Sequence, residues 1–424
     1  MTRRTSLALV VAIASCAGLL WPCCSREDVP VSRSGSAPPI VPAPPSASGA
    51  LPGAARAEDD VRVRVEPTSH RTRVVDLPFP AVDVVAGAAP SREFVDGTLV
   101  FAKTVDEGFA LVEWDPVSAR TLREVTHLHR PGNGIQVGST CALTRTGSGF
   151  AYATTGDEDP SPIELWFVGQ DFAKQHHRVI DVLTVDARRL SLHASGETLA
   201  LAHCERGEHH ITTFDVPTGN VVGERKLGRK LALCVGYTTP LSDVRVVGTT
   251  VWSVSGGVSE YQAVALSRDL RRVVRRYPIP TPGFDSEARE SAIDRGTFPR
   301  FDVTPTRMAW NTRGELRVSA LRGGTPIWKG RVDPTSIGSG PISSPEEMDF
   351  PMAIDPKTGA ALLGDGTWFA PDGAETRVFR TREEQPDYAP IPIRHRRRVA
   401  FAHGRGVFLG VSPERATLVL VDPN

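Results

Sequence analysis

The chain repeats one pattern about seven times between residue 61 and its last residue. In each unit a small or turn residue precedes an apolar strand, a loop follows, and a second apolar strand ends in Asp-Pro or a similar pair. Short β-rich runs bounded by Gly and Pro are typical of strands and hairpins, not of a helical solenoid. The repeat therefore favours an all-β architecture built from one unit. The first strands with their turns are DGTLVFA (96–102), GSGFAYA (147–153), SGETLALA (195–202), GTTVWSV (248–254), PTRMAWN (305–311), TGAALLG (358–364) and GRGVFLG (404–410).

The length of the unit narrows the choice of repeat. The units average about 52 residues, and propeller repeats of the WD40 type run about 40–45 residues with four strands to a blade. The 38 Gly and 35 Pro residues against 4 Met agree with many turns and few helices. The chain resembles the β-propeller superfamily, with units similar to WD40 or bacterial surface-propeller repeats. Trp114-Asp115 stands once where a WD dipeptide would, and no subfamily is indicated.

The resemblance implies an all-β fold, a β-propeller of seven four-stranded blades over residues 61–424. Six or eight blades are the alternatives, because the sixth unit is compact and its third strand (TWFAP) is thin. The final unit ends just after its third strand, and residues 71–78 (RTRVVDLP) resemble the fourth strand at 271–278 (RRVVRRYP). We expect this N-terminal strand to close the ring, because it would satisfy an otherwise open edge of backbone donors.

The first residues are typical of a secretory signal. Met1–Arg4 are basic and Leu7–Ala14 form an apolar run. Ile13-Ala14-Ser15-Cys16 resembles a lipobox, which makes Cys16 the expected site of lipid attachment. The apolar segment continues to Trp21, so an uncleaved membrane anchor is the alternative. Residues 1–28 are therefore predicted to be a lipoprotein signal, a simple secretory signal peptide or a membrane anchor.

A segment rich in Pro, Ala and Ser separates this signal from the repeats. Residues 29–60 cannot bury enough apolar surface to offset the entropy of ordering them, and their prolines favour extended conformations. We expect a disordered tether that holds residues 61–424 at a membrane. The predicted location is the periplasm or the cell surface, with membrane attachment through the N-terminal lipid or anchor.

The expected binding site is the rim of the central channel. In propellers the connections from the last strand of one blade to the first strand of the next lie on one face, near the channel mouth, and loops there carry function. Two such connections are long, 280–299 and 381–396. The predicted ligand-binding rim consists of His127, His129, Arg130, Asp302, Glu347, Asp349, Arg394 and Arg396.

The acidic residues Asp302, Glu346, Glu347 and Asp349 could ring the channel, and their oxygens are of the kind that hold calcium. The His residues near Cys204 match no zinc spacing, so we expect neither a metal site there nor any other cofactor. Export permits oxidation, and we predict a disulfide between Cys204 and Cys234. Cys141 is then left as a buried apolar residue.

Charge and motifs limit the function classes. The 49 basic residues balance the 49 acidic ones, which argues against a nucleic-acid partner. No nucleophile elbow, His-Glu-x-x-His helix or phosphate-binding glycine loop is found, so no catalytic residue is assigned. We expect a monomeric, non-enzymatic binding or scaffold module whose partner is an envelope protein or polysaccharide. The alternative is a periplasmic propeller enzyme, lactonase-like or quinone-dependent, which an acid, His and Arg cluster converging in the channel would favour.

Overall fold

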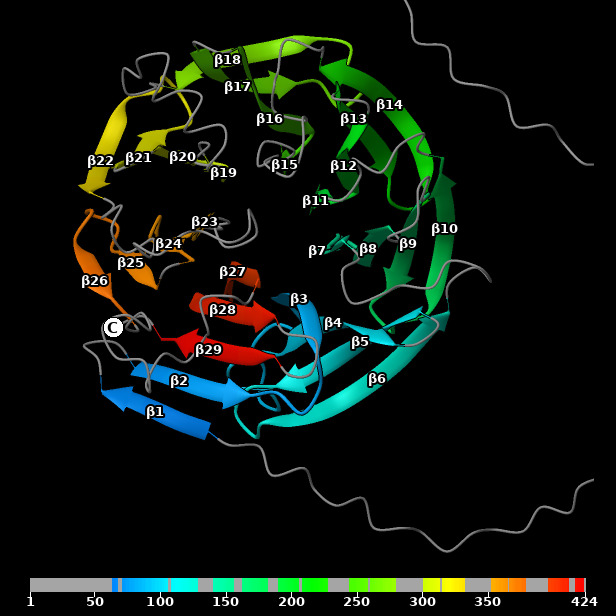
Figure 1. Cartoon of the computed structure of the whole chain (residues 1–424), viewed down its shortest axis with the longest axis vertical. Coiled ribbons are helices and arrows are strands. Elements are labelled where there is room, and N and C mark those ends of the chain that lie inside the picture. The colour runs from blue at the N-terminus through cyan, green and yellow to red at the C-terminus, as the bar shows by residue number, and fades with distance from the viewer. Residues whose placement is uncertain are drawn as a thin grey trace, which may run out of the picture. The chain divides into compact units, whose positions relative to one another are not determined.

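Seven antiparallel sheets surround a common axis in the computed structural model, and each sheet is one blade of a β-propeller (Figure 1). The predicted all-β, seven-bladed architecture is confirmed. Among the described residues, no helix is long and apolar enough to cross a membrane. The structure describes residues 63–67, 71–105, 108–128, 140–155, 162–181, 190–205, 208–227, 244–257, 260–279, 300–312, 315–331, 352–364, 366–378, 396–411 and 416–422.

Blades 1 to 6 follow one another along the chain, and the first strand of each is the innermost. Blade 6 has the shortest strands, as its sequence indicated. From inside outward, blade 1 consists of β3 (Ala81–Ala86), β4 (Leu99–Val105), β5 (Gly108–Asp115) and β6 (Arg120–Leu128), and blade 2 of β7 (Thr140–Arg145), β8 (Gly149–Thr155), β9 (Ile163–Gly169) and β10 (Lys174–Ile180). Blade 3 consists of β11 (Ser191–Ser195), β12 (Thr198–Glu205), β13 (Glu208–Asp215) and β14 (Asn220–Leu227), and blade 4 of β15 (Val244–Val247), β16 (Thr250–Gly257), β17 (Glu260–Leu266) and β18 (Val273–Ile279). Blade 5 consists of β19 (Arg300–Val303), β20 (Arg307–Thr312), β21 (Glu315–Ala320) and β22 (Pro326–Arg331), and blade 6 of β23 (Met352–Ile354), β24 (Ala361–Leu363), β25 (Thr367–Phe369) and β26 (Glu375–Arg377).

Blade 7 joins the two ends of the propeller. Its inner strands are β27 (Arg396–Ala402), β28 (Arg405–Val411) and β29 (Thr417–Val421). The N-terminal strand β2 (Arg71–Asp76) pairs antiparallel with β29, which confirms the predicted closure. A further strand, β1 (Val63–Pro67), pairs with the outer side of β2, so this sheet has five strands where four were expected.

The fifth strand covers the outer edge that is most open to unwanted pairing. The outermost strands of blades 1 to 5 each contain a register irregularity against their inner neighbour, and β26 of blade 6 has only three residues. Bulges and short strands both discourage pairing with another chain. In contrast, β2 pairs with β29 in unbroken register over five residue pairs. Its regular edge is therefore the one that needs a cover.

Three Asp residues at the ends of strands of the repeat, two of them in Asp-Pro pairs, fix tight turns. Asp115, Asp215 and Asp355 each accept a hydrogen bond from a hydroxyl three residues later, at 2.5, 2.8 and 2.6 Å. A short acidic side chain that bonds to its own turn fixes the tight connection between two strands. The Asp-x-x-Ser/Thr pattern therefore explains why the units are punctuated at these positions.

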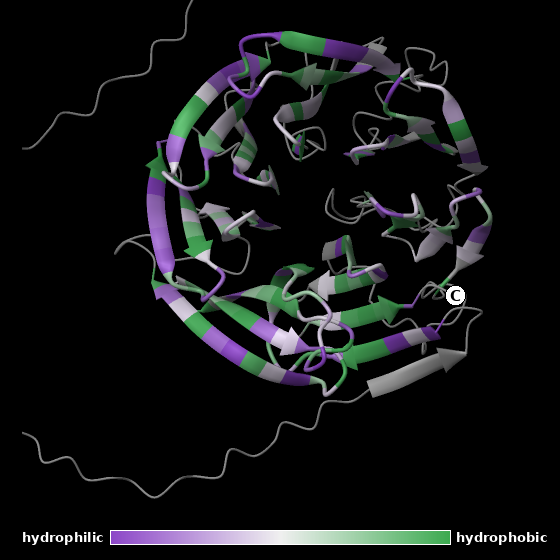
Figure 2. Ribbon diagram, turned by 180° about the vertical axis from the view of Figure 1, so that it is seen from behind, coloured by the Kyte–Doolittle hydropathy of each residue, from purple (hydrophilic) through white to green (hydrophobic). Residues whose placement is uncertain are grey.

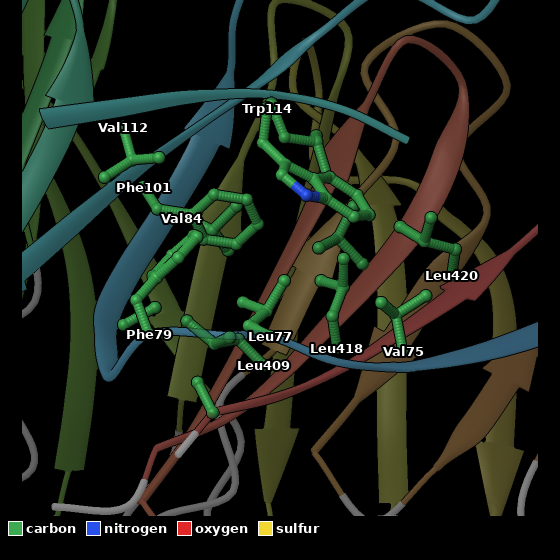
Figure 3. Packing of buried hydrophobic residues seen from close by; sticks show 14 of the residues in the cluster. Val75, Leu77, Phe79, Val84, Phe101, Val112, Trp114, Leu409, Leu418 and Leu420 are labelled. Carbon is green, nitrogen blue, oxygen red and sulfur yellow. The ribbon is translucent and has the colours of Figure 1, made fainter. Parts of the chain in front are cut away.

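The hydrophobic core lies between blades and not within a single layer. Both faces of the middle strands are covered by neighbouring sheets, so β8 and β9 are buried along their whole length. Most residues of the outer strands are exposed or half-buried, and hydrophilic residues recur along these strands (Figure 2). At the closure, Val75 and Leu77 pack with Trp114 of blade 1 and with Leu418 of blade 7 (Figure 3). The strand that closes the ring therefore also fills the core between its first and last blades.

Candidate functional site

The innermost strands carry polar side chains that connect neighbouring blades. Each of these strands pairs with only one neighbour in its sheet, so its inner edge has backbone groups without a strand partner. Buried backbone N–H groups need an acceptor. We call one equivalent position in each innermost strand the inner ring; it is polar in five of the seven blades, where its side chain contacts another blade, and alanine in blades 2 and 6. The inner ring consists of Asp83, Ala142, His193, Arg245, Asp302, Ala353 and Arg398, in the order of blades 1 to 7.

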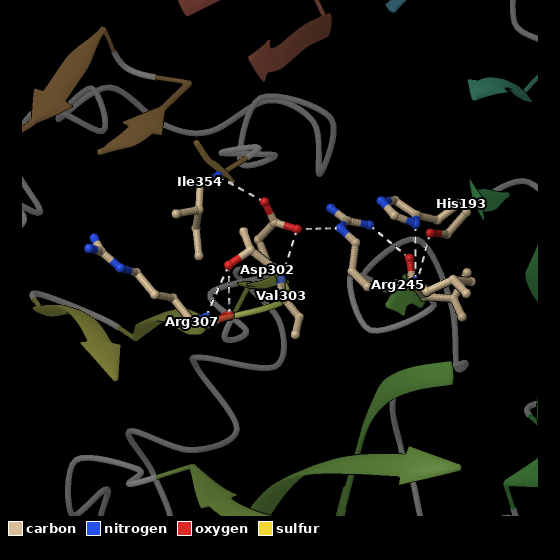
Figure 4. Close-up of polar contacts among 10 residues, drawn as sticks. His193, Arg245, Asp302, Val303, Arg307 and Ile354 are labelled. Carbon is tan, nitrogen blue, oxygen red and sulfur yellow. Dashed lines mark hydrogen bonds and ion pairs between the residues drawn. The ribbon is translucent and has the colours of Figure 1, made fainter. Parts of the chain in front are cut away.

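Three inner-ring side chains accept a hydrogen bond from the backbone of the following blade. Asp83 Oδ2 accepts from the N–H of Leu143 at 2.8 Å, and His193 Nδ1 from that of Val246 at 3.0 Å. Asp302 Oδ2 accepts from Ile354 at 2.8 Å in the same way (Figure 4). The repeated geometry connects blade 1 to blade 2, blade 3 to blade 4 and blade 5 to blade 6.

The strand β11 contacts blade 4 along its whole length, through three side chains and not one. Its alternate side chains point to one side, as strand geometry requires. Ser191 Oγ accepts from the N–H of Val244 at 3.0 Å, and Ser195 Oγ accepts from that of Gly248 at 3.1 Å. With His193 between them, the three side chains satisfy three successive outward N–H groups of blade 4.

Two arginines complete the inner ring. Arg245 Nε donates to Asp302 Oδ1 at 2.7 Å, which pairs blade 4 with blade 5 (Figure 4). Arg398 Nε lies 4.0 Å from Asp83 Oδ1, and its Nη2 donates to the carbonyl of Cys141 at 3.1 Å. Blade 7 is thereby connected to blades 1 and 2. Both oxygens of Asp302 are engaged, because Oδ1 also accepts from the N–H of Val303.

Burial shifts the pKa of two inner-ring groups, Asp83 and His193. It raises the pKa of Asp83, while Arg398 and the two backbone donors act in the opposite direction. Burial, with a smaller contribution from Arg245, lowers the pKa of His193 to about 3. The imidazole of His193 is therefore neutral at pH 7, in keeping with Nδ1 as an acceptor. This arrangement braces the blades against one another.

The buried histidines make stability depend on pH. The pKa of His193 and that of His203, which burial and two neighbouring histidines depress, are both lowered from 6.5 to about 3. The unfolded chain takes up these protons first, so stability is complete above about pH 6.5 and is lost as the pH falls through that value. We expect each residue to cost about 2 kcal/mol of unfolding free energy at pH 5. Denaturant titration at about pH 7.5 and 5 should show a smaller loss in a His193→Gln/His203→Gln variant. Equal losses in both proteins would contradict the assignment.

The expected position of His127 is wrong. The sequence placed it on a loop at the channel mouth, but it lies in β6, the outermost strand of blade 1, and is 7% exposed. Its ring stacks on Phe109 at 5.1 Å and lies 6.1 Å from Trp166 of blade 2. Burial lowers its pKa. His127 therefore belongs to the packing between the outer parts of two blades.

Asp302 does lie on an innermost strand, where it pairs with Arg245 of blade 4 and accepts a hydrogen bond from Ile354 of blade 6. His129, Arg130, Glu347, Asp349 and Arg394 fall outside the described residues, as do Cys16 and Cys234. Arg396 begins β27 and Cys204 lies in β12, and the structure does not describe their side chains. Cys141 is 3% exposed, buried as the sequence analysis expected.

The other inner-ring residues were missed, although the sequence carries a signal for them. A charged residue or a histidine stands between two apolar residues in AVDVVA (81–86), SLHAS (191–195), VRVV (244–247) and RFDV (300–303). An ion or polar side chain in such a strand needs a partner from elsewhere. The pattern predicts a contact, but the partner lies in another blade and cannot be named from the pattern.

Metal ligands do not gather within the part of the chain that the structure describes: no group there brings together three or more His, Cys, Asp or Glu side chains. His203 and His210 face each other across β12 and β13, with ring centroids 5.1 Å apart. His209 is the neighbour of His210 in β13 and so lies on the opposite face of the strand.

Comparisons with known proteins find weak likenesses to solved structures. No protein-family model and no curated protein matches the sequence. Similar solved structures include the hydrazine synthase of Kuenenia stuttgartiensis, which is 14% identical with a TM-score of 0.42 over 70% of this chain and 78% of that one. The Dos1 propeller is 8% identical with a TM-score of 0.39 over 77% of this chain and 76% of that one. Likenesses this weak carry no argument about activity. By its own seven sheets, the chain is a β-propeller.

Proposed function

We propose that this propeller is a non-enzymatic binding or scaffold module tethered in the cell envelope. One observation carries the proposal: the described acidic residues of the inner ring, Asp83 and Asp302, use their oxygens to accept from backbone N–H groups of their own and the next blade and to pair with arginines of other blades. A general acid or base must instead reach a substrate proton. Carboxylates that hold neighbouring blades together favour a role as a rigid support over a role as a catalytic centre.

The recognition surface in this proposal is the face with the long connections. Residues 280–299 and 381–396 hold many charged residues, and all of them except Arg396 lie outside the described residues. Long loops on a rigid scaffold are common sites of binding. Cys16 attaches the lipid, and residues 29–60 give the module reach toward an envelope protein or polysaccharide. Nucleic acid is not a partner, and the module acts as a monomer.

Removal of charge from the long-loop face should weaken partner capture. An Arg394→Ser/Arg396→Ser/Arg397→Ser variant, or a variant shortened within 284–294, should recover less partner from envelope extract than the wild type. Stability should change by less than about 0.5 kcal/mol per surface substitution. The matched control is Arg71→Ser/Arg120→Ser/Lys357→Ser, which removes three exposed charges near the opposite turns. Unchanged capture by both loop variants, together with loss in the control, would place recognition on the other face.

A second candidate is a periplasmic propeller enzyme, either a lactonase-like hydrolase or a quinone-dependent dehydrogenase. One observation favours it: His193, Arg245 and Asp302 lie close together on three successive innermost strands (Figure 4). In this case Asp302 would act with Glu347 and Asp349 as oxygen ligands for calcium. Metal analysis of the purified protein separates the two proposals, because a stoichiometric ion would favour the enzyme.

A further inference from the structure

The outer wall of blades 3 to 5 has a strong excess of basic residues. The outermost strands and the turns before them, residues 216–227, 267–279 and 321–331, hold ten Arg and Lys residues against two acidic ones, Glu224 and Asp269. The whole chain has a formal net charge of zero. Ordinary solvated surfaces intersperse charges of both signs. An excess of one sign on one wall therefore calls for an explanation.

Five exposed arginines form the centre of this surface, which we call the basic wall. Among the described residues, none of them makes an ion pair with a carboxylate. Arg275 Nη1 donates to the hydroxyl of Tyr277 at 2.6 Å and to the carbonyl of Leu321 at 3.3 Å, and these neutral acceptors leave its charge uncompensated. Asp269 accepts hydrogen bonds from Ser267 Oγ and from the backbone N–H of Arg271. The basic wall consists of Arg271, Arg272, Arg275, Arg276 and Arg322.

The basic wall is continuous across blade boundaries. Arg225 of blade 3 donates from Nη1 to the carbonyl of Leu270, the residue before Arg271, at 2.8 Å. Arg275 of blade 4 reaches the carbonyl of Leu321, the residue before Arg322. The positive charge thus follows the circumference along β14, β18 and β22, which lie on successive sectors of the rim (Figure 1).

The shape of the wall selects among anionic partners. A flat membrane can touch a convex rim at only one blade at a time, whereas a flexible chain can follow the curve. A register irregularity beside Val274 and a proline at position 278 hinder the addition of an acidic peptide to the β18 edge. Single-stranded nucleic acid prefers aromatic platforms, but Tyr277 is half-buried and stacks with Trp252 at 5.8 Å.

A linear acidic polysaccharide meets these conditions. Its carboxylate or sulfate groups repeat along a flexible chain and suit the planar, forked donors of Arg. We propose that the basic wall binds such a polysaccharide along the outside of blades 3 to 5. This inference goes beyond the proposed binding at the long-loop face, because it assigns a second partner of stated chemistry to a separate surface.

The test uses the full-length protein and fluorescently labelled polygalacturonate, with affinity measured by anisotropy. An Arg271→Ser/Arg272→Ser/Arg276→Ser variant should bind about tenfold more weakly than the wild type, and salt should weaken the wild type more steeply than the variant. The matched control is again Arg71→Ser/Arg120→Ser/Lys357→Ser, which makes the same change in net charge elsewhere. It should stay within about twofold of the wild type. Thermal melting verifies that all three proteins are folded.

Three results would overturn the inference: no binding by the wild type, equal weakening in the two triple variants, or tighter binding to oligo-dT or polyglutamate than to polygalacturonate. The first two remove the basic wall as a site, and the third gives it a different class of partner. Capture from envelope extract that depends on residues 394–397 tests the proposed function separately. That capture can persist when the glycan inference fails, and glycan binding can persist when loop-dependent capture fails.

Discussion

Deletion of residues 61–78 should prevent the chain from forming a stable ring. The deletion removes β2, and with it the partner of β29 and the buried side chains of Val74, Val75 and Leu77. Each buried side chain of this size contributes about 1.5–3 kcal/mol. The sum is comparable to the whole free energy of unfolding of a typical domain, about 5–15 kcal/mol. We expect the deleted protein to be insoluble, or to melt far below the full-length chain.

A shorter deletion is the control for this experiment. Removal of residues 61–67 takes away β1 but leaves β2 in place, so the core between blades 7 and 1 is kept (Figure 3). This variant should melt close to the wild type but scatter more light on storage, because the regular edge of β2 is then exposed. A 61–78 deletion that melts at the wild-type temperature would refute closure by the N-terminal strand.

Replacement of Asp302 by Ala should be among the most destabilising single changes in the inner ring. It leaves Arg245 without its carboxylate and leaves the N–H groups of Val303 and Ile354 without their acceptor. Removal of one partner of a largely buried ion pair costs about 3–5 kcal/mol. Denaturant titration should show a loss of this size. Because three blades meet at this residue, the loss should affect the cooperative unfolding of the ring and not one strand alone.

Two further variants separate the charge from the hydrogen bonds. Asp302→Asn keeps one acceptor oxygen and should lose less stability than Asp302→Ala. An Arg245→Met/Asp302→Ala double variant should recover part of the loss, because no unpaired charge remains. A double variant that is less stable than Asp302→Ala by the full effect of Arg245→Met alone would show that the two side chains are not coupled.

Much of the architecture could be read from local patterns. Strands, turns and the repeat are properties of short stretches, and the Asp-x-x-Ser/Thr turns close within four residues. Ring closure was also predictable, because the final unit lacks a fourth strand and residues 71–78 match the missing pattern. The added strand β1 was not predicted. Its role depends on the regular pairing of β2 with β29, which is a property of two segments more than 300 residues apart.

Side-chain partners depended on the tertiary structure. His127 and Asp302 were both expected at the channel rim, but one lies in an outermost strand and the other in an innermost strand. Their positions along the chain do not distinguish these cases, because a blade's first and last strands both lie beside a connection between blades. Asp83 meets Arg398 only because closure brings blade 7 beside blade 1. The sequence by itself determined the repeating unit and its turns, since these arise within a few residues. Packing between blades decided which charges are braced, which are buried and which remain on the outer wall, because a partner's identity depends on contacts that no local pattern contains.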